Sequence, residues 1–159
     1  MSAHPSSQPA SITTSRATLA DLDDLTALFD AYRVFYRRAS DHAVARTFIE
    51  ERLQRGESVI FIARDASGKA LGFTQLYPAF SSVSARRIWI LNDLFVAPGT
   101  RNRGVARQLM DRARAFATEA GALRLVLETA EDNHPAQTLY EALGYARETG
   151  TRHYALELA

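Results

Sequence analysis

The chain contains no cysteine among its 159 residues, so disulfide bonds, thiolate nucleophiles and zinc sites with thiolate ligands are excluded. Its four histidines are scattered without the spacing of a metal site, and we expect no metal ion. A surplus of charge of one sign is also lacking, because the formal net charge is +1. We therefore expect neither a nucleic acid nor a membrane as the partner.

Long apolar runs are absent as well, and no segment approaches the roughly 20 residues that span a bilayer. The opening residues, MSAHPSSQPAS, contain neither the basic nor the apolar region of a signal peptide, and we expect a cytoplasmic protein. Serine, proline and alanine dominate this stretch. The sequence therefore predicts a flexible tail over residues 1–11 and a single domain over residues 12–159.

The hydrophobic pattern of the remaining chain predicts strands mixed with amphipathic helices. We expect strands over residues 12–17, 58–65, 70–78, 86–98, 123–129 and 152–158, and helices over residues 21–38, 40–56, 104–120 and 134–144. Helix caps support this assignment, with Asp21 and then Ser40 or Asp41 at helix starts and Gly56 at a helix end. The order favours an α+β (mixed α/β) fold with a mixed central sheet and helices on its faces.

Residues 101–106, Arg-Asn-Arg-Gly-Val-Ala, lie between a predicted strand and a predicted helix. The N-terminus of a helix binds phosphate, a glycine lets the backbone approach a ligand closely, and arginines add forked donors. This pattern is typical of a pyrophosphate-binding loop, although an ordinary surface turn with solvated arginines has the same residues. Neither Gly-Lys-Ser/Thr nor G-x-G-x-x-G is present, so phosphates would be held here rather than transferred.

Two motifs carry a resemblance to a known family. The pattern R-x-x-G-x-A over residues 101–106 and the pattern N-x-x-A-x-x-x-Y-x-x-x-G-Y over residues 133–145 are similar to those of the GCN5-related N-acetyltransferases, the GNAT superfamily. The order of elements matches over residues 12–158. The stretches WILNDLFV and NHPAQTLY look closest to the branch of yeast histone/D-amino-acid and diamine acetyltransferases. The resemblance implies a GNAT-like single domain with six to seven strands and about four helices.

The resemblance also implies acetyl-CoA as the co-substrate. The loop after the fourth strand would receive the pyrophosphate, the backbone of that strand would pair with the pantetheine arm, and one face of the last helix would complete the site. The residues that this assigns to acetyl-CoA are Leu94, Phe95, Val96, Arg101, Asn102, Arg103, Gly104, Val105, Ala106, Arg107, Asn133, Ala136 and Tyr140.

Two residues are candidates for the chemistry of acetyl transfer. Tyr140, a phenol protonated at neutral pH, would protonate the departing thiolate, although a tyrosine here could simply pack on its helix. Asp93 lies in an otherwise apolar strand and would bind a cationic amine or accept its proton through a water, or else serve as a structural carboxylate. A backbone N–H of Phe95 or Val96 would stabilise the carbonyl oxygen.

The acceptor site is the least defined part of the prediction. Tyr32, Tyr36, Gln75, Asn92 and Glu128 join Asp93 as candidate substrate-binding residues, although the tyrosines could belong to the core and Gln75 could pair across its hairpin. The diamine enzymes usually carry a glutamate where this chain has an asparagine, which counts against a polyamine.

The leading hypothesis is an N-acetyltransferase that acts on a primary amine of a small molecule or peptide by direct attack in a ternary complex. A non-catalytic acyl-CoA-binding module is the alternative, and a nucleic-acid-binding role is disfavoured by the balanced charge. The resemblance further suggests a homodimer that pairs through the segment RHYALEL.

Overall fold

The computed structural model describes residues 11–101 and 103–158. The predicted tail therefore lies outside the described residues except for Ser11, as does Asn102 of the predicted loop. Contacts group the chain into two units, of which the first ends at Leu127 and the second begins at Glu128.

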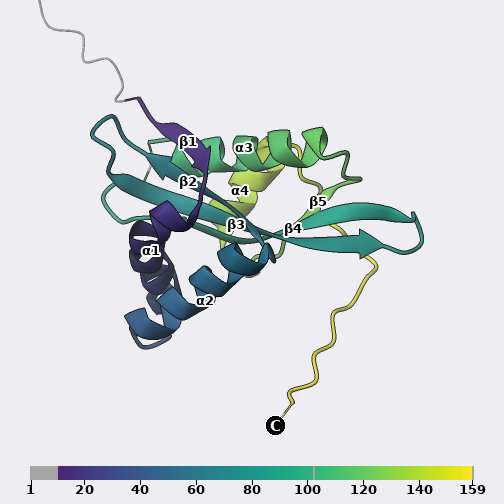
Figure 1. The fold of residues 1–159 in the computed structure, drawn as a ribbon. Coiled ribbons are helices and arrows are strands. Elements are labelled where there is room, and N and C mark those ends of the chain that lie inside the picture. Colours follow the sequence, from purple (N-terminus) through teal and green to yellow (C-terminus); the bar gives the residue numbers. More distant parts are fainter. Residues whose placement is uncertain (1–10, 102, 159) are drawn as a thin grey trace, which may run out of the picture. The chain divides into compact units, whose positions relative to one another are not determined.

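The first unit is built on a five-stranded sheet with the strand order β1-β2-β3-β4-β5 (Figure 1). Neighbouring strands are antiparallel from β1 to β4, and β5 runs parallel to β4. The strands are β1 (Thr13–Arg16), β2 (Val59–Arg64), β3 (Ala70–Ser81), β4 (Arg86–Val96) and β5 (Leu125–Val126). This arrangement confirms the mixed sheet predicted from the sequence.

The helices of the first unit cover the two faces of this sheet. The short 3-10 helix η1 (Leu19–Asp21), α1 (Leu22–Phe35) and α2 (His42–Arg55) lie on one face, and α3 (Val105–Glu119) lies on the other (Figure 1). A fourth α-helix, α4 (His134–Ala142), belongs to the second unit. Across the described ranges, no helix is long and apolar enough to cross a membrane.

Two layers of apolar side chains hold the first unit together. On the α1 and α2 face the buried cluster contains Leu25, Leu28, Phe29, Ala45, Ile49, Ile60, Ile62, Phe73 and Phe95. On the other face α3 buries Val105, Leu109, Met110, Ala113 and Ala117. The apolar stripe of α3, repeating every three or four residues, therefore packs on the sheet as its pattern predicts.

Local polar contacts fix where the first helices begin and end. The Thr18 and Asp21 side chains form a capping box around η1, so Asp21 acts there rather than by a side-chain cap on α1. Asp41 caps α2 by accepting from the Val44 N–H (3.0 Å), and Gly56 ends this helix with a φ of +63°. The sequence prediction for α2 is confirmed.

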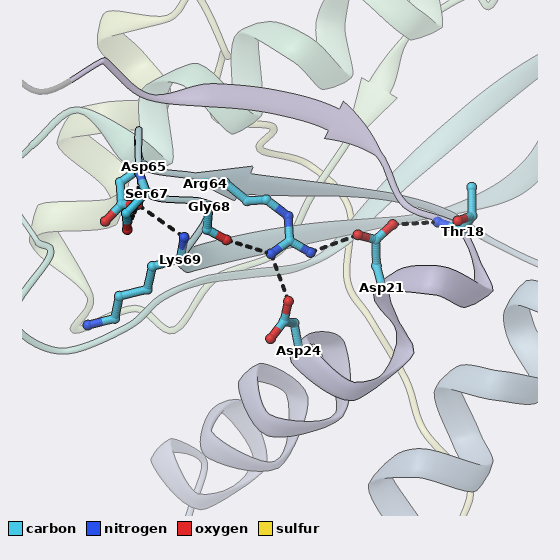
Figure 2. Close-up of polar contacts among 8 residues, drawn as sticks. All are labelled: Thr18, Asp21, Asp24, Arg64, Asp65, Ser67, Gly68 and Lys69. Carbon is cyan, nitrogen blue, oxygen red and sulfur yellow. Dashed lines mark hydrogen bonds and ion pairs between the residues drawn. The ribbon is translucent and has the colours of Figure 1, made fainter.

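Arg64, at the end of β2, ties the sheet to the start of α1 (Figure 2). Its guanidinium donates to Asp21 Oδ1 and to Asp24 Oδ2, both at 2.7 Å, and to the Gly68 carbonyl at 2.9 Å. The next residue, Asp65, accepts from the Lys69 N–H (3.0 Å) and thereby closes the β2–β3 turn. The Arg64 guanidinium thus holds the start of α1 against the end of β2, next to the β2–β3 turn.

One predicted strand is much shorter than expected and another is absent, so the sheet has five strands among the described residues rather than six to seven. The strand expected over residues 123–129 is only Leu125–Val126, because its partner β4 bulges just beyond the paired residues. Residues 152–158 form no strand, although Tyr154, Leu156 and Leu158 alternate with polar residues. These three side chains are 84–90% exposed. The alternation of apolar and polar residues is typical of a strand, but a strand forms only where its backbone can hydrogen-bond to a second strand.

Candidate active site

The loop before α3 begins with a tight turn. Gly99 has a φ of +85°, and the Thr100 N–H donates to the Ala97 carbonyl (3.2 Å) across Pro98 and Gly99. Proline followed by a residue of positive φ is typical of a type II turn. The Thr100 hydroxyl also donates to the Ala97 carbonyl (2.7 Å), which anchors the turn. The turn ends β4 and directs the chain toward the start of α3.

Gly104 is the N-cap of α3 and provides no side chain to cap it. Its φ of +76° lies in the left-handed region that favours glycine, and a Cβ there would meet no atom within 4 Å. Gln108 donates to the Gly104 carbonyl (3.1 Å) in the first turn of the helix. The N–H groups of Val105, Ala106 and Arg107 therefore have no acceptor within the helix. An uncapped helix start of this kind suits the pyrophosphate predicted to bind there.

Three arginines surround this helix start, and all are exposed: Arg101, Arg103 and Arg107. The Arg101 guanidinium lies 5.6 Å from the centre of the Phe35 ring, and its Nε donates to the Val96 carbonyl (3.4 Å). Arg101 therefore lies between the end of α1 and the end of β4, where its donors can also face a phosphate.

A β-bulge in β4 lies next to the candidate base. Gln75 is opposite Asp93 while Leu76 is opposite Leu91, so Asn92 is the extra residue. A bulge bends its strand and changes the direction of nearby side chains. Pairing with β5 stops one residue before Leu91, and among the described residues no strand pairs with that side of β4 further on. The second half of β4 consequently has a free edge.

The pattern of hydrogen bonds between β3 and β4 determines which amides face this free edge. The Ala97 N–H donates to the Leu71 carbonyl (2.8 Å), and bonded pairs alternate along an antiparallel ladder. Phe95 therefore turns its N–H toward β3, whereas Leu94 and Val96 turn theirs toward the free edge. Of the two amides expected to stabilise a carbonyl oxygen, that of Val96 has the suitable direction.

Asp93 is a buried carboxylate held by neutral donors. It is 3% exposed, Gln75 Nε2 donates to its Oδ2, and Asn92 Nδ2 donates to its Oδ1 (3.0 Å). The Ser58 hydroxyl donates in turn to Gln75 Oε1 (2.8 Å). In the part of the chain that the structure describes, no cation lies within ion-pair distance of Asp93. Gln75 is itself fully buried and pairs across the hairpin, so it positions Asp93 rather than touching solvent.

Two tyrosines face Asp93 from different elements, Tyr32 of α1 and Tyr77 of β3. Burial raises the pKa of Tyr32 far above its usual value, and the negative charge of Asp93 raises it further. Burial, followed by the same carboxylate, raises the pKa of Tyr77 to about 12. Both phenols therefore stay protonated throughout the physiological range and surround Asp93 with neutral groups.

Tyr32 belongs to an aromatic cluster on this face of the sheet, formed by Phe29, Tyr32, Phe35, Tyr36, Phe73 and Phe95. Tyr36 is 55% exposed at the end of α1, while Phe73 is fully buried. Tyr32 packs against the core and also reaches Asp93, and its contact with an acceptor stays a prediction.

A cavity of about 420 Å³ opens beside this cluster, between the second half of α1 and the loop after β4. It is lined by Asp30, Ala31, Val34, Phe35, Phe95, Pro98 and Arg101. Asp30 is buried there and accepts from the Ser40 hydroxyl (2.6 Å) and from the Asp41 N–H (2.7 Å). Ser40 lowers the pKa of Asp30 most, against the opposing effect of burial. The cavity is mainly apolar and adjoins the predicted pyrophosphate loop.

The second unit carries the remaining predicted residues. Asn133 caps α4 by accepting from the Ala136 N–H (3.3 Å), so these two motif residues are bonded to each other. Tyr140 lies one turn further along the same helix and is half-buried, with its ring 6.1 Å from that of Tyr145. Glu128 is exposed and lies 3.4 Å from His153 Nδ1. The predicted spacing on one face of α4 is consistent with this helix.

Sequence reasoning missed Ser58 and Tyr77, which join the buried surroundings of Asp93. Ser58 precedes an apolar strand and resembles any loop serine. Tyr77 is part of a strand whose alternation does not reveal its partners. The sequence offered one indication of these partners, the polar Gln75 within an apolar strand. A buried amide is costly unless it is hydrogen-bonded, so Gln75 implies polar neighbours.

Comparison with known proteins identifies the class to which this fold and site belong. The sequence profile of the Acetyltransferase (GNAT) family matches residues 25–145. The chain belongs to this family and is a GNAT acetyltransferase.

The uncharacterized N-acetyltransferase YhfO of Bacillus subtilis is 47% identical over 143 residues, which cover 90% of this chain and 95% of that protein. A crystal structure of a "probable acetyltransferase" is 42% identical, covers 92% of this chain and 98% of its own, and superimposes with a TM-score of 0.87. These similarities support N-acetyltransferase activity.

More distant similarities concern the ligand and the branch. The aminoglycoside N-acetyltransferase AAC(6')-Iy, solved in complex with CoA, shares the fold with a TM-score of 0.79 at 22% identity, over 96% of this chain and 99% of that one. The D-amino-acid N-acetyltransferase HPA3 of Saccharomyces cerevisiae is 28% identical over 122 residues, 74% of each protein. This distance does not establish the yeast branch as the nearest one.

Proposed function

We propose that the chain transfers the acetyl group of acetyl-CoA to a primary amine of a small molecule or peptide, by direct attack in a ternary complex. The observation that carries this proposal is the buried Asp93 carboxylate, which has no cationic partner among the described residues and lies in the part of β4 that has a free edge. A buried anion with neutral donors attracts a cation, and the ammonium form of an amine supplies one.

The residues fit acetyl-CoA at two places in the first unit. The N–H groups at the start of α3 would hold its pyrophosphate, because Gly104 leaves that helix end uncapped and without a Cβ in the way. The free edge of β4 would pair with its pantetheine arm through Leu94 and Val96. Bound there, acetyl-CoA supplies an acetyl group activated as a thioester.

The chain's own groups would then direct the proton transfers. Asp93 attracts the ammonium and accepts one proton through a water, which leaves a neutral amine. The amine nitrogen forms a bond to the acetyl carbon while the carbon–sulfur bond breaks, and the Val96 N–H donates to the carbonyl oxygen. Tyr140 would donate its phenolic proton to the departing thiolate. The acylated nitrogen would release its remaining extra proton to solvent, and the phenolate would regain a proton from solvent. The products are an acetylated amine and CoA with a free thiol.

A panel of amines tests this function. Purified protein and acetyl-CoA are mixed with an aminoglycoside, a polyamine, an amino acid or a lysine peptide, and both released thiol and acetylated product are measured. We expect at least one amine to be acetylated, with initial-rate lines that intersect as a ternary complex requires. Binding of acetyl-CoA without acetylation of any amine would favour the acyl-CoA-binding module instead.

Asp93→Asn is the matching variant, because it keeps the shape of the side chain and removes its charge. We expect kcat/KM for the amine to fall about 100-fold or more, the usual loss when an acid or base is removed. Asp111→Asn, at an exposed position of α3, removes the same charge and should leave the rate unchanged. Equal rates for Asp93→Asn and the natural protein would refute the assigned role.

We also propose a cytoplasmic location and a homodimer. The apolar residues Tyr154, Leu156 and Leu158 are exposed in a segment with strand-like alternation, which suits pairing with the same segment of a second copy. Light scattering during size-exclusion chromatography should give the mass of two chains, and Leu156→Lys should reduce it to one. Subcellular fractionation of the native host tests the location.

A further inference from the structure

Three buried polar residues from neighbouring segments of the sheet form one hydrogen-bonded chain. Ser58, Gln75 and Asp93 are 6%, 0% and 3% exposed. Ser58 directly precedes β2, Gln75 lies in the middle of β3, and Asp93 directly follows the bulge in β4. Burying such groups is tolerated only when they are satisfied, and apolar side chains of similar volume often stabilise a core equally well. Stability alone therefore does not explain why these three hydrogen-bonded residues are buried.

The hydrogen bonds among Ser58, Gln75 and Asp93 run in one direction, with each residue donating to the next. The Ser58 hydroxyl donates to Gln75 Oε1 (2.8 Å), and Gln75 Nε2 donates to Asp93 Oδ2. The opposite orientation of the Gln75 amide would bring its oxygen against the carboxylate and remove the acceptor of Ser58. Ser58 thus selects the amide orientation that supports a negative charge, although it does not touch Asp93 itself.

We infer that Gln75 and Ser58 are positioning residues that hold the Asp93 carboxylate in the orientation in which it receives a cationic amine. This inference rests on the proposed function, because it assigns to Asp93 the contact with the acceptor. Gln75 fixes one carboxylate oxygen and Asn92 the other, so the plane of the group is determined. A charged acceptor strengthens both hydrogen bonds.

The described side chains that face Asp93 bring no positive charge next to its carboxylate. Tyr32 of α1 and Tyr77 of β3 face it as neutral phenols, with Tyr36 beside Tyr32. Arg52 of α2 is the cation of this region that acts on Tyr77, and it is paired with Glu57 at 2.8 Å. Tyr32 also forms a hydrogen bond with the Asp93 carboxylate, so among the described residues its side-chain donors are this phenol and the amides of Gln75 and Asn92.

Gln75→Met tests the inference, because methionine has a similar length and cannot donate. The orientation of the Asp93 carboxylate is compared in crystal structures of the natural protein and of the variant, both without acetyl-CoA. We expect the carboxylate to turn away from its natural orientation in the variant. The kcat/KM for the amine should fall at least about tenfold, the effect of one charge-assisted hydrogen bond, while KM for acetyl-CoA stays unchanged.

Thr74→Val is the matched control. The Thr74 hydroxyl is fully buried and donates to the main-chain carbonyl of Asp93 (2.8 Å), so its loss removes a buried hydrogen bond to the same residue without affecting the carboxylate. We expect the carboxylate orientation and the kcat/KM for the amine to stay natural in this variant. If Gln75→Met does not fold, Ser58→Ala replaces it, with an expected fall in kcat/KM of about threefold.

The readouts separate this inference from the proposed function. An unchanged carboxylate orientation in folded Gln75→Met, or an equal change of orientation in Thr74→Val, would overturn the inference whatever the activity. A turned carboxylate with an unchanged kcat/KM for the amine would also overturn it, because the orientation would then not serve the reaction. A natural protein that acetylates no amine would overturn the proposed function, and the crystal structures would still show whether Gln75 holds the carboxylate.

Discussion

Replacing Gly72 by alanine should push β3 away from the part of β4 whose opposite edge is proposed to hold acetyl-CoA. Gly72 lies opposite Val96, and a Cβ built on it would be 2.5 Å from the Phe95 carbonyl oxygen and 3.2 Å from Val96 Cα. These are backbone atoms, so the strand itself must shift. Overpacking of this kind costs about 1–3 kcal/mol. At about 2–4 °C for each kcal/mol in a chain of this size, Tm should fall by roughly 2–12 °C.

The same shift should raise KM for acetyl-CoA, because Leu94 and Val96 would lose their alignment. Gly68→Ala is the control, since Gly68 lies in the turn of the same hairpin with a φ of +86° and no atom within 4 Å of an added Cβ. The control should lose about 1–2 kcal/mol of stability through its positive φ and keep the natural KM. Natural Tm and KM in Gly72→Ala, or an equal KM increase in the control, would refute this reasoning.

Three further predictions concern separate parts of the chain. Gly104→Val should weaken acetyl-CoA binding at least tenfold by calorimetry, because a β-branched residue cannot easily keep a φ of +76°; unchanged affinity would misplace the loop. Tyr140→Phe should lower kcat about 100-fold with little change in affinity for acetyl-CoA, and an unchanged kcat would remove its acid role. The pKa of Asp30 is lowered, chiefly by Ser40, so this carboxylate should stabilise the fold above about pH 4 and lose that effect as the pH falls further. In urea titrations, the free energy of unfolding of Asp30→Asn should be about 2 kcal/mol lower at pH 7 and should change less between pH 7 and acidic pH.

Much of the fold could be predicted because it depends on interactions between residues that are close in sequence. The start of α2 at Asp41 and its end at Gly56 depend on local caps, and the stripe of α3 depends on its own period. The position of Gly104 at the mouth of α3 was predicted for the same reason. Each of these features is decided within about one helical turn of chain.

Long-range pairing accounts for what the sequence did not predict. Alternation at Tyr154, Leu156 and Leu158 suggested a strand, but no partner strand pairs with it among the described residues. The bulge at Asn92 arises from the register between β3 and β4, which neither strand specifies alone. Asp93 could be proposed from its polarity in an apolar strand, whereas its donor chain through Ser58 depends on a contact 17 residues apart in sequence.

Calorimetric titration of the purified chain with acetyl-CoA tests the central claim most directly, with ATP and NAD as controls. The account predicts one site with selective, micromolar-range affinity, which corresponds to about 8 kcal/mol. That result would support the loop around Gly104 and the free edge of β4 as the binding site. Absence of binding, or equal binding of ATP, would contradict an acetyl-CoA site and with it the proposed acetyl transfer.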